Sequence, residues 1–152
     1  MRSYPMPMPF GWFQVAWSDE VAAGSSAPLF YFGRHLVAWR GEDGTPHVWD
    51  AFCPHLGAHL GGNAKIEGDA IRCPMHSWQY DATGACVDVP YSDRVNKQAK
   101  IRTYPVIERN GALLAWYHPE GAEPSWDVPQ LDQFGGGAGY PELFRRQLHV
   151  DV

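Results

Sequence analysis

Two short segments, each holding one cysteine and one histidine, constrain this chain more than any other feature. The first reads CPH at positions 53–55, and the second reads CPMH at positions 73–76. A spacer of seventeen residues, 56–72, separates them, so the pattern is C-x-H followed by C-x-x-H. Thiolate and imidazole groups are ligands of zinc and of iron–sulfur clusters. The two segments therefore predict a metal centre whose ligands converge from two loops.

The distribution of ligand types over the two segments bears on which metal is bound. Structural zinc sites usually pair like with like, whereas each segment here holds one ligand of each type. If the two cysteines bind one iron ion and the two histidines bind a second, each segment spans a two-iron cluster. This mixed ligation is that of a Rieske [2Fe-2S] centre, with a structural zinc site as the alternative. The candidate ligands, for cofactor and metal alike, are Cys53, His55, Cys73 and His76.

Length and composition favour one self-sufficient globular domain. The chain has 152 residues, 45% of them apolar and 14% aromatic, which is enough for a core without disulfides. The net charge of -5 comes from dispersed acidic residues, so we expect neither nucleic acid nor a membrane surface as a partner. Of three cysteines, only Cys86 lies outside the metal pattern, which excludes a disulfide framework.

The first nine residues are expected to form a disordered or surface-lying arm. Prolines at positions 5, 7 and 9 oppose helix and remove sheet donors. The same stretch has a single arginine and no apolar run, which argues against a signal peptide or a membrane anchor. We therefore expect a cytoplasmic location.

Short runs of strand-forming residues with frequent turns predict an all-β sandwich or barrel. One turn of helix is expected at 18–20, and tight hairpin turns are expected at Gly33-Arg34 and around Asn110-Gly111. The expected strands are 11–17, 29–32, 35–40, 47–51, 70–72, 101–108 and 112–118.

Residues 10–118 resemble the Rieske domain of the ring-hydroxylating oxygenase family. The sequences CPHLGAHLGG at 53–62 and CPMHSWQYDATG at 73–84 match its two cluster loops. The whole stretch, including GWFQVAW at 11–17, is similar in particular to oxygenase components that act on steroids, the 3-ketosteroid hydroxylase group. The resemblance implies a Rieske-type fold, a small antiparallel β-sandwich or barrel with a cluster-binding subdomain. It implies that the cysteines ligate the inner iron, that the histidines ligate the outer iron through Nδ1, and that 87–93 covers the cluster.

The same resemblance predicts a low midpoint potential. Rieske centres span roughly -150 to +300 mV. The high-potential proteins of respiratory complexes add a disulfide between the loops and a serine that donates to a cluster sulfide. The corresponding positions here are Ala58, Met75 and Trp78, none of which can do this.

Residues 119–152 are expected to be a linker or tail. PSWDVPQLD at 124–132 and FRRQLHVDV at 144–152 resemble the linker and first strand of the family's catalytic domain. That domain holds a mononuclear iron on a His-x4-His pair and a carboxylate, whereas this sequence offers only His149 beyond residue 118. We therefore expect no mononuclear iron site, and no catalytic residue, in this chain.

Two functions follow from the resemblance. In the first, the chain is a one-electron carrier that accepts electrons from a flavin or ferredoxin-type reductase and passes them to an oxygenase catalytic domain. In the second, it is the electron-accepting N-terminal part of a hydroxylase that acts on a hydrophobic substrate, such as a steroid or an aromatic compound. Either role makes it an oxidoreductase or electron-transport component.

The remaining candidates are expected to be structural. Cys86 follows a turn and is interpreted as a small buried apolar residue, and His59 as a loop-packing residue. Gly135–Gly137 lacks the strand-to-helix context of a phosphate loop. The other histidines expected to be structural or exposed are His35, His47, His118 and His149.

Overall fold

A computed structural model describes residues 7–132 and residue 134 of the chain. The described part consists of strands and loops, with a single 3-10 turn and no α-helix. In chain order the elements are β1 (Gly11–Trp17), η1 (Ser18–Glu20), β2 (Ser26–Tyr31), β3 (Arg34–Arg40), β4 (Pro46–Asp50), β5 (Lys65–Glu67), β6 (Ala70–Arg72), β7 (Gln79–Asp81), β8 (Cys86–Asp88), β9 (Thr103–Tyr104), β10 (Val106–Arg109) and β11 (Ala112–Tyr117).

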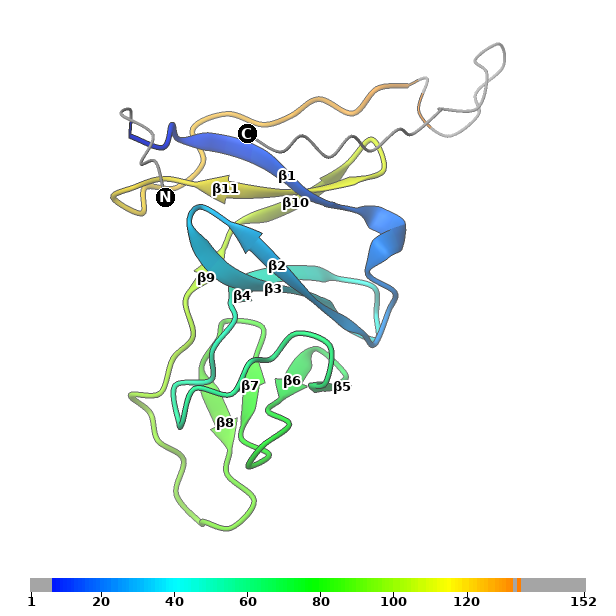
Figure 1. The fold of residues 1–152 in the computed structure, drawn as a ribbon. Helices are drawn as coiled ribbons and strands as arrows, with labels where there is room; N and C mark the ends of the chain where they lie inside the picture. Colours follow the sequence, from blue (N-terminus) through cyan, green and yellow to red (C-terminus); the bar gives the residue numbers. More distant parts are fainter. Residues whose placement is uncertain (1–6, 133, 135–152) are drawn as a thin grey trace.

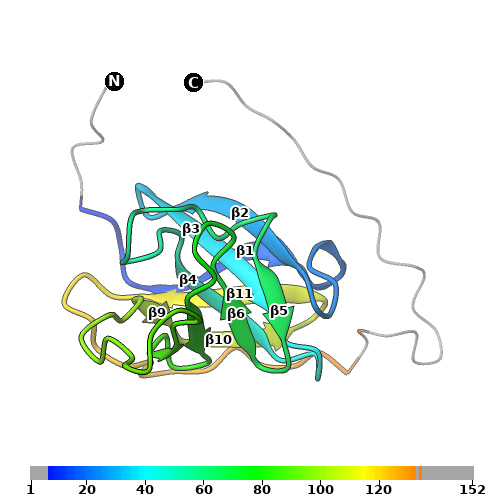
Figure 2. The same ribbon diagram turned by 90° about the horizontal axis from the view of Figure 1, so that it is seen from below.

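The strands form three antiparallel sheets, which confirms the all-β prediction. Their strand orders are β1-β11-β10, β2-β3-β4-β9 and β5-β6-β7-β8. The sheet of β2, β3, β4 and β9 lies in the middle, with β1, β10 and β11 on one side and β5–β8 on the other (Figure 1). The view from below in Figure 2 likewise places β5 and β6 in front of the central sheet. The metal motifs belong to the β5–β8 end of the molecule.

Strand β3, in the interior of the central sheet, is buried on both faces over residues 36–39, which are all apolar. Successive side chains of a strand point to opposite faces. Leu36 and Ala38 contribute to the core shared with β1 and β11. Val37 and Trp39 contribute to the second core, which lies against β5–β8 and also contains both motif cysteines. The two loops that carry the Cys/His segments, at 53–55 and 73–76 and called the metal loops below, are therefore anchored in the same packed core as the central sheet.

Two hairpins are closed by two-residue turns in which both residues are left-handed. Asn110 and Gly111 have φ of 54° and 73°, as their sequence predicts for a type I′ turn. In the β2–β3 hairpin the turn residues are Phe32 and Gly33, with φ of 57° and 71°. The prediction of Gly33-Arg34 was wrong by one position, because glycine takes the second turn position and Arg34 pairs with Tyr31.

The strand predicted over 101–108 was also wrong in extent, because Pro105 divides it. Thr103–Tyr104 pairs with β4 in the central sheet, whereas Val106–Arg109 pairs with β11 in the outer one. Proline has no N–H to donate and fixes φ, so the chain changes sheet there. Strand β5, over Lys65–Glu67, was not predicted.

A buried arginine ties the outer sheet to the central one. Arg40 on β3 is 9% exposed, and its guanidinium makes two hydrogen bonds to the Glu108 carboxylate, at 3.0 and 3.2 Å. It also donates to the carbonyls of Ser18, Val21 and Gly44. The hydrogen bonds from Arg40 lower the pKa of Glu108 below its ordinary value.

The segment after β11 has no strand in its described part, but it packs on the outer sheet. Trp126 contacts Trp116 at a ring-centroid distance of 5.6 Å, and its carbonyl accepts a hydrogen bond from Trp12 Nε1. The expected catalytic-domain strand at 144–152, Gly135–Gly137 and His149 lie outside the described residues, as do residues 1–6 of the expected arm. The described residues include no helix with the length and apolar character that a membrane crossing requires.

Candidate metal centre

The first Cys/His segment is a tight loop that follows β4. The Cys53 N–H donates to the Ala58 carbonyl, and the Gly57 N–H donates to the Cys53 carbonyl, both at 2.9 Å. Gly57 has φ of 76°, a left-handed conformation that glycine adopts without strain. An isolated bridge between Phe52 and His59 closes the base of this loop. The loop therefore reverses direction within six residues.

The second segment repeats this geometry between β6 and β7. The Cys73 N–H donates to the Trp78 carbonyl at 2.8 Å, and the Ser77 N–H donates to the Cys73 carbonyl at 3.0 Å. Here the left-handed residue is Ser77, with φ of 59°. The two motifs are thus two copies of one turn, each starting at its cysteine.

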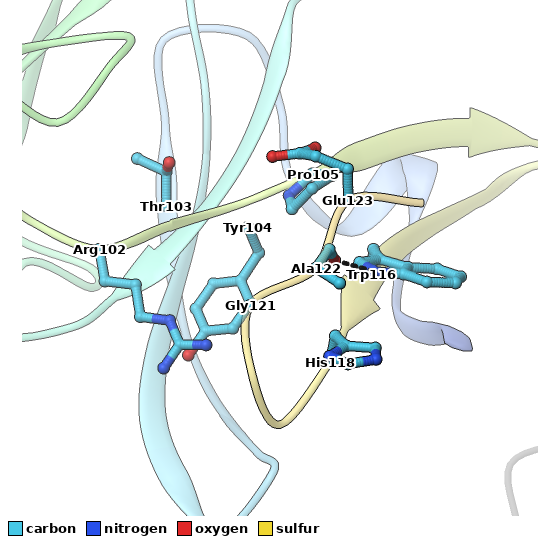
Figure 3. A pocket seen from close by; sticks show the side chains of 9 residues that line it. All are labelled: Arg102, Thr103, Tyr104, Pro105, Trp116, His118, Gly121, Ala122 and Glu123. Atoms are coloured by element: carbon cyan, nitrogen blue, oxygen red, sulfur yellow. Dashed lines mark hydrogen bonds between the residues drawn. The ribbon is translucent and has the colours of Figure 1, made fainter. Parts of the chain in front are cut away.

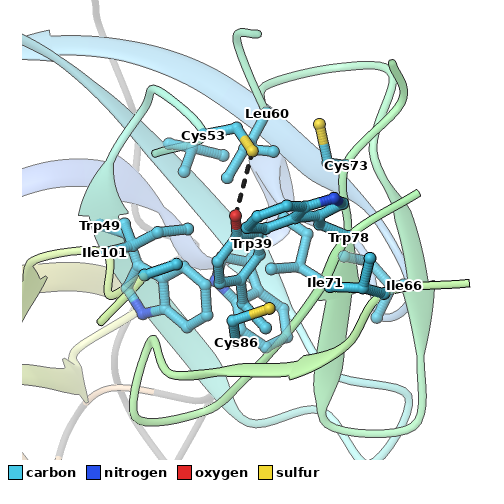
Figure 4. Packing of buried hydrophobic residues seen from close by; sticks show 14 residues of the cluster. Trp39, Trp49, Cys53, Leu60, Ile66, Ile71, Cys73, Trp78, Cys86 and Ile101 are labelled. Carbon is cyan, nitrogen blue, oxygen red and sulfur yellow. Dashed lines mark hydrogen bonds between the residues drawn. The ribbon is translucent and has the colours of Figure 1, made fainter. Parts of the chain in front are cut away.

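The structure brings the four predicted ligands to one region. Cys53 and Cys73 are each 2% exposed and belong to the buried cluster drawn in Figure 4. The rings of His55 and His76 contact each other edge to face, with centroids 4.8 Å apart and both half-buried. The two loops therefore present sulfur toward the core and imidazole toward the outside.

The side chains suit the [2Fe-2S] group that the motif implies. His55 Nδ1 is buried and has no hydrogen-bond partner in the described part of the chain. A buried polar nitrogen is costly unless something satisfies it, and metal coordination does so. Three histidine, cysteine or acidic side chains do not gather around one point within the described residues. A two-iron cluster needs no such group, because each iron receives two protein ligands.

A hydrogen bond links one candidate ligand, Cys53, to a side chain that is not itself a candidate ligand. Tyr80 on β7 is fully buried, and its hydroxyl lies 3.1 Å from Cys53 Sγ. Burial, followed by the contact with Cys53, raises the pKa of Tyr80, so the phenol keeps its proton. Burial also raises the pKa of the Cys53 thiol, although the Tyr80 hydrogen bond opposes this. If Cys53 binds metal as a thiolate, Tyr80 would be the donor and Cys53 the acceptor.

Tyr80 both packs in the core and makes a hydrogen bond, because it lies in the buried cluster and its hydroxyl reaches Cys53. The partner could not be read from the sequence, since Cys53 is on the other loop. A tyrosine seven residues after the second cysteine, on the strand that leaves the loop, is the signal that pointed toward it.

Aromatic side chains cover the histidine side of the centre. The Trp78 indole stacks on the His55 ring, with centroids 4.3 Å apart and planes 9° apart. Its Nε1 donates to the hydroxyl of Tyr91, which lies in the loop after β8 and is 64% exposed. Val89 of that loop is buried in the same core. Of the expected third loop over 87–93, residues 87 and 88 belong to β8 instead, and residues 89–91 pack beside the two Cys/His loops.

Two other sequence candidates, Cys86 and His59, have polar contacts of their own. Cys86 is buried, as predicted, and its thiol points at the Asp88 carbonyl at 3.8 Å. His59 Nδ1 accepts the Gly61 N–H at 2.9 Å, which confirms a loop-packing role. A pocket of about 140 Å³, lined by residues that include Arg102 and His118, lies beside β9 and β11 and contains none of the predicted ligands (Figure 3).

Comparison with known proteins points to one family. Residues 11–105 match the family profile described as the Rieske [2Fe-2S] domain. The chain is 43% identical over 134 residues to a cholesterol 7-desaturase of Bombyx mori, covering 86% of this chain and 30% of that protein. It is 36% identical over 127 residues to a 3-ketosteroid-9-alpha-monooxygenase oxygenase component of Rhodococcus rhodochrous, covering 82% and 33%.

A solved structure gives the same assignment of fold. The reduced complex between oxygenase and ferredoxin in carbazole 1,9a-dioxygenase matches with a TM-score of 0.60 and 28% identity, over 69% of this chain and 28% of that chain. This chain therefore spans about a third of the length of the relatives that it matches. The family match implies a Rieske-type [2Fe-2S] cluster as the cofactor.

Proposed function

This chain belongs to the Rieske [2Fe-2S] domain family, and from that premise we propose that it transfers single electrons through one such cluster between a reductase and an oxygenase. We propose Cys53, His55, Cys73 and His76 as the ligands. The observation that carries this proposal is the convergence of two like turns, with two buried sulfurs and the unpartnered Nδ1 of His55. We also propose that residues 10–118 form the cluster domain and that 119–152 form a linker or tail.

When bound, the cluster supplies reversible one-electron chemistry at a potential set by its ligands and their surroundings. The chain's own residues provide those surroundings. Tyr80 holds its proton at the hydroxyl and donates it toward Cys53 Sγ, which stabilises negative charge there. Burial of both cysteines excludes water from the sulfur side. The half-buried imidazoles of His55 and His76 provide a route from the centre to the surface.

The proposed electron donor is a flavin or ferredoxin-type reductase, and the proposed acceptor is an oxygenase catalytic domain. The carbazole 1,9a-dioxygenase structure is a complex of oxygenase and ferredoxin, which supports electron-transfer partners of this general kind. A cytoplasmic location is part of the proposal, and cell fractionation tests it.

The second candidate is that the chain is the electron-accepting part of a sterol or steroid oxygenase. It is favoured by the names of two relatives, a cholesterol 7-desaturase and a 3-ketosteroid-9-alpha-monooxygenase component, of which the chain spans about a third. The reading frame after Val152 distinguishes the two candidates. A frame that continues with two histidines and a carboxylate supports the oxygenase part, and a stop codon supports the carrier.

Anaerobic reductive titration tests the electron-transfer proposal itself. The purified protein should take up one electron per chain, and its visible spectrum should bleach with a single midpoint. Re-oxidation by a chemical oxidant should restore the spectrum without loss of iron. Uptake of no electrons by protein that contains iron would contradict the proposal.

A further inference from the structure

The two metal loops close with the same turn but place different residues at its left-handed position. That position lies four residues after each cysteine and is Gly57 in the first loop and Ser77 in the second. Their φ values are 76° and 59°. Glycine adopts this conformation freely, whereas a residue with a Cβ is strained in it. The second loop therefore carries strain that the first avoids.

Space does not explain the difference between the loops. A Cβ added at Gly57 would meet no atom within 4 Å, so conformation rather than crowding favours glycine there. The second loop keeps a side chain at the matching position despite the same backbone requirement. Some other interaction must hold Ser77 in its conformation.

Arg72 supplies an interaction that the first loop lacks. Its Nη1 donates to the Ser77 carbonyl at 2.7 Å, a length typical of a charge-assisted hydrogen bond. Arg72 directly precedes Cys73, and the residue that directly precedes Cys53 is Phe52, which is 49% exposed and has no such group. An arginine guanidinium is thus bonded to the strained turn at Ser77, whereas the turn at Gly57 has no arginine at the matching position.

The Arg72 side chain is itself held from two further strands. Its Nε donates to Glu67 on β5 at 3.0 Å, and its Nη1 also donates to Asp88 on β8 at 2.9 Å. Glu67 receives a second hydrogen bond from Gln79 on β7. The Arg72 side chain is only 21% exposed, so its planar fork has little freedom to leave this arrangement.

We propose that Arg72 is a positioning residue for the metal centre. Its guanidinium holds the Ser77 carbonyl, keeps the left-handed turn in place, and so fixes the direction of the adjacent His76 ring toward the cluster. The inference rests on the proposed function, because it assumes that His76 is a ligand. Lysine cannot replace this arginine fully, since one ammonium group cannot bond Glu67 and the Ser77 carbonyl with the same geometry.

A double-mutant cycle on the cluster-loaded protein tests the proposal. We would measure the rate of cluster loss to a chelator by visible circular dichroism for wild type, Arg72→Gln, Ser77→Gly and the double variant. Arg72→Gln should lose its cluster about tenfold faster, which corresponds to about 1.4 kcal/mol. In the Ser77→Gly background the same change should matter by about twofold or less, because glycine needs no restraint.

Two further variants distinguish the positioning of His76 from a general effect on protein stability. Arg72→Lys, the conservative variant, should retain a cluster and show an altered EPR line shape, because the His76 ring is less well fixed. Arg109→Gln, the matched control, removes an arginine from a surface pair with Asp127 at 3.4 Å and should leave the rate of cluster loss unchanged.

The outcomes separate this inference from the proposed function. A wild-type protein without iron and inorganic sulfide would overturn both. Suppose the cluster is present, and Arg72→Gln speeds its loss by the same factor in the wild-type and Ser77→Gly backgrounds. That result would overturn only the positioning role and would assign Arg72 to general stability of the β5–β8 sheet. An unchanged rate in Arg72→Gln would overturn it as well.

Discussion

Replacing Tyr80 with phenylalanine should lower the midpoint potential of the centre while leaving the fold intact. The phenol is fully buried, and its only polar contact in the described structure that involves a candidate ligand is with Cys53 Sγ, at 3.1 Å. Phenylalanine keeps the ring in the core and removes the hydroxyl alone. The change therefore isolates one hydrogen bond to a sulfur ligand.

The size of the shift follows from how that hydrogen bond depends on charge. Reduction adds one negative charge to the centre, and a hydrogen bond to a charged acceptor is stronger than a neutral one by about 1 kcal/mol. For a one-electron couple a tenfold change in equilibrium constant is about 59 mV, so about 1 kcal/mol corresponds to about 40 mV. The midpoint of Tyr80→Phe should fall by roughly this amount.

Potentiometric titration followed by visible circular dichroism measures the shift. Tyr104→Phe is the matched control, because its hydroxyl donates to Asp50 at 2.8 Å and its ring lies in the other core. That variant should change stability and leave the midpoint in place. A midpoint for Tyr80→Phe within about 10 mV of wild type, in protein with full iron content, would refute the reasoning, since it is well below the roughly 40 mV expected.

Two further changes test the fold that supports the centre. Glu108→Gln should destabilise the protein by about 1–2 kcal/mol in urea unfolding, because it leaves the buried Arg40 without its carboxylate while the exposure of Glu108 permits partial screening. Since Arg40 lowers the pKa of Glu108, the stability from this pair is present at neutral pH and is lost as pH falls below about 4.3. Glu108→Gln should therefore lose less stability than wild type over that acid range. Parallel plots of unfolding free energy against pH for the two proteins would count against the assignment. Gly84→Ala should lower the free energy of unfolding by about 2–4 kcal/mol, because its Cβ would collide with the Ile101 carbonyl. Gly62→Ala, with a similar positive φ and open space around it, should lower it by about 1 kcal/mol. Equal losses of stability in the two variants would show that relaxation relieves the collision.

Local signals in the sequence predicted most strands and one turn correctly. Asn110-Gly111 is specific because both residues tolerate positive φ, and the type I′ turn it predicts is present. The β2–β3 turn was misplaced by one residue, because a single glycine does not say which turn position it occupies. Pro105 was visible, but only the pairing of the strands around it shows that the chain changes sheet there.

The candidate ligands could be predicted from spacing, whereas their surroundings could not. Cysteine and histidine with fixed local spacing form a pattern within a few residues of chain. The Tyr80 contact with Cys53, the stack of Trp78 on His55 and the hydrogen bond from Arg72 to Ser77 depend on side-chain directions and on contacts between separate loops. Such contacts leave no periodic signal in a sequence.

The predicted low midpoint remains a prediction, and the structure qualifies its basis. The sequence argument counted Ala58, Met75 and Trp78, which supply neither the disulfide nor the serine hydroxyl of the high-potential proteins. The Tyr80 hydroxyl is a donor in addition to these, and it acts to raise the potential. A midpoint above about +100 mV would contradict the prediction of the low end of the Rieske range.

The most direct test of the central claim is the iron and acid-labile sulfide content of the freshly purified protein, measured with its EPR spectrum after reduction. The account predicts two irons and two sulfides per chain, and loss of the spectrum when either His55 or His76 is replaced by alanine. Protein without inorganic sulfide, or a spectrum unaltered by both replacements, would contradict it.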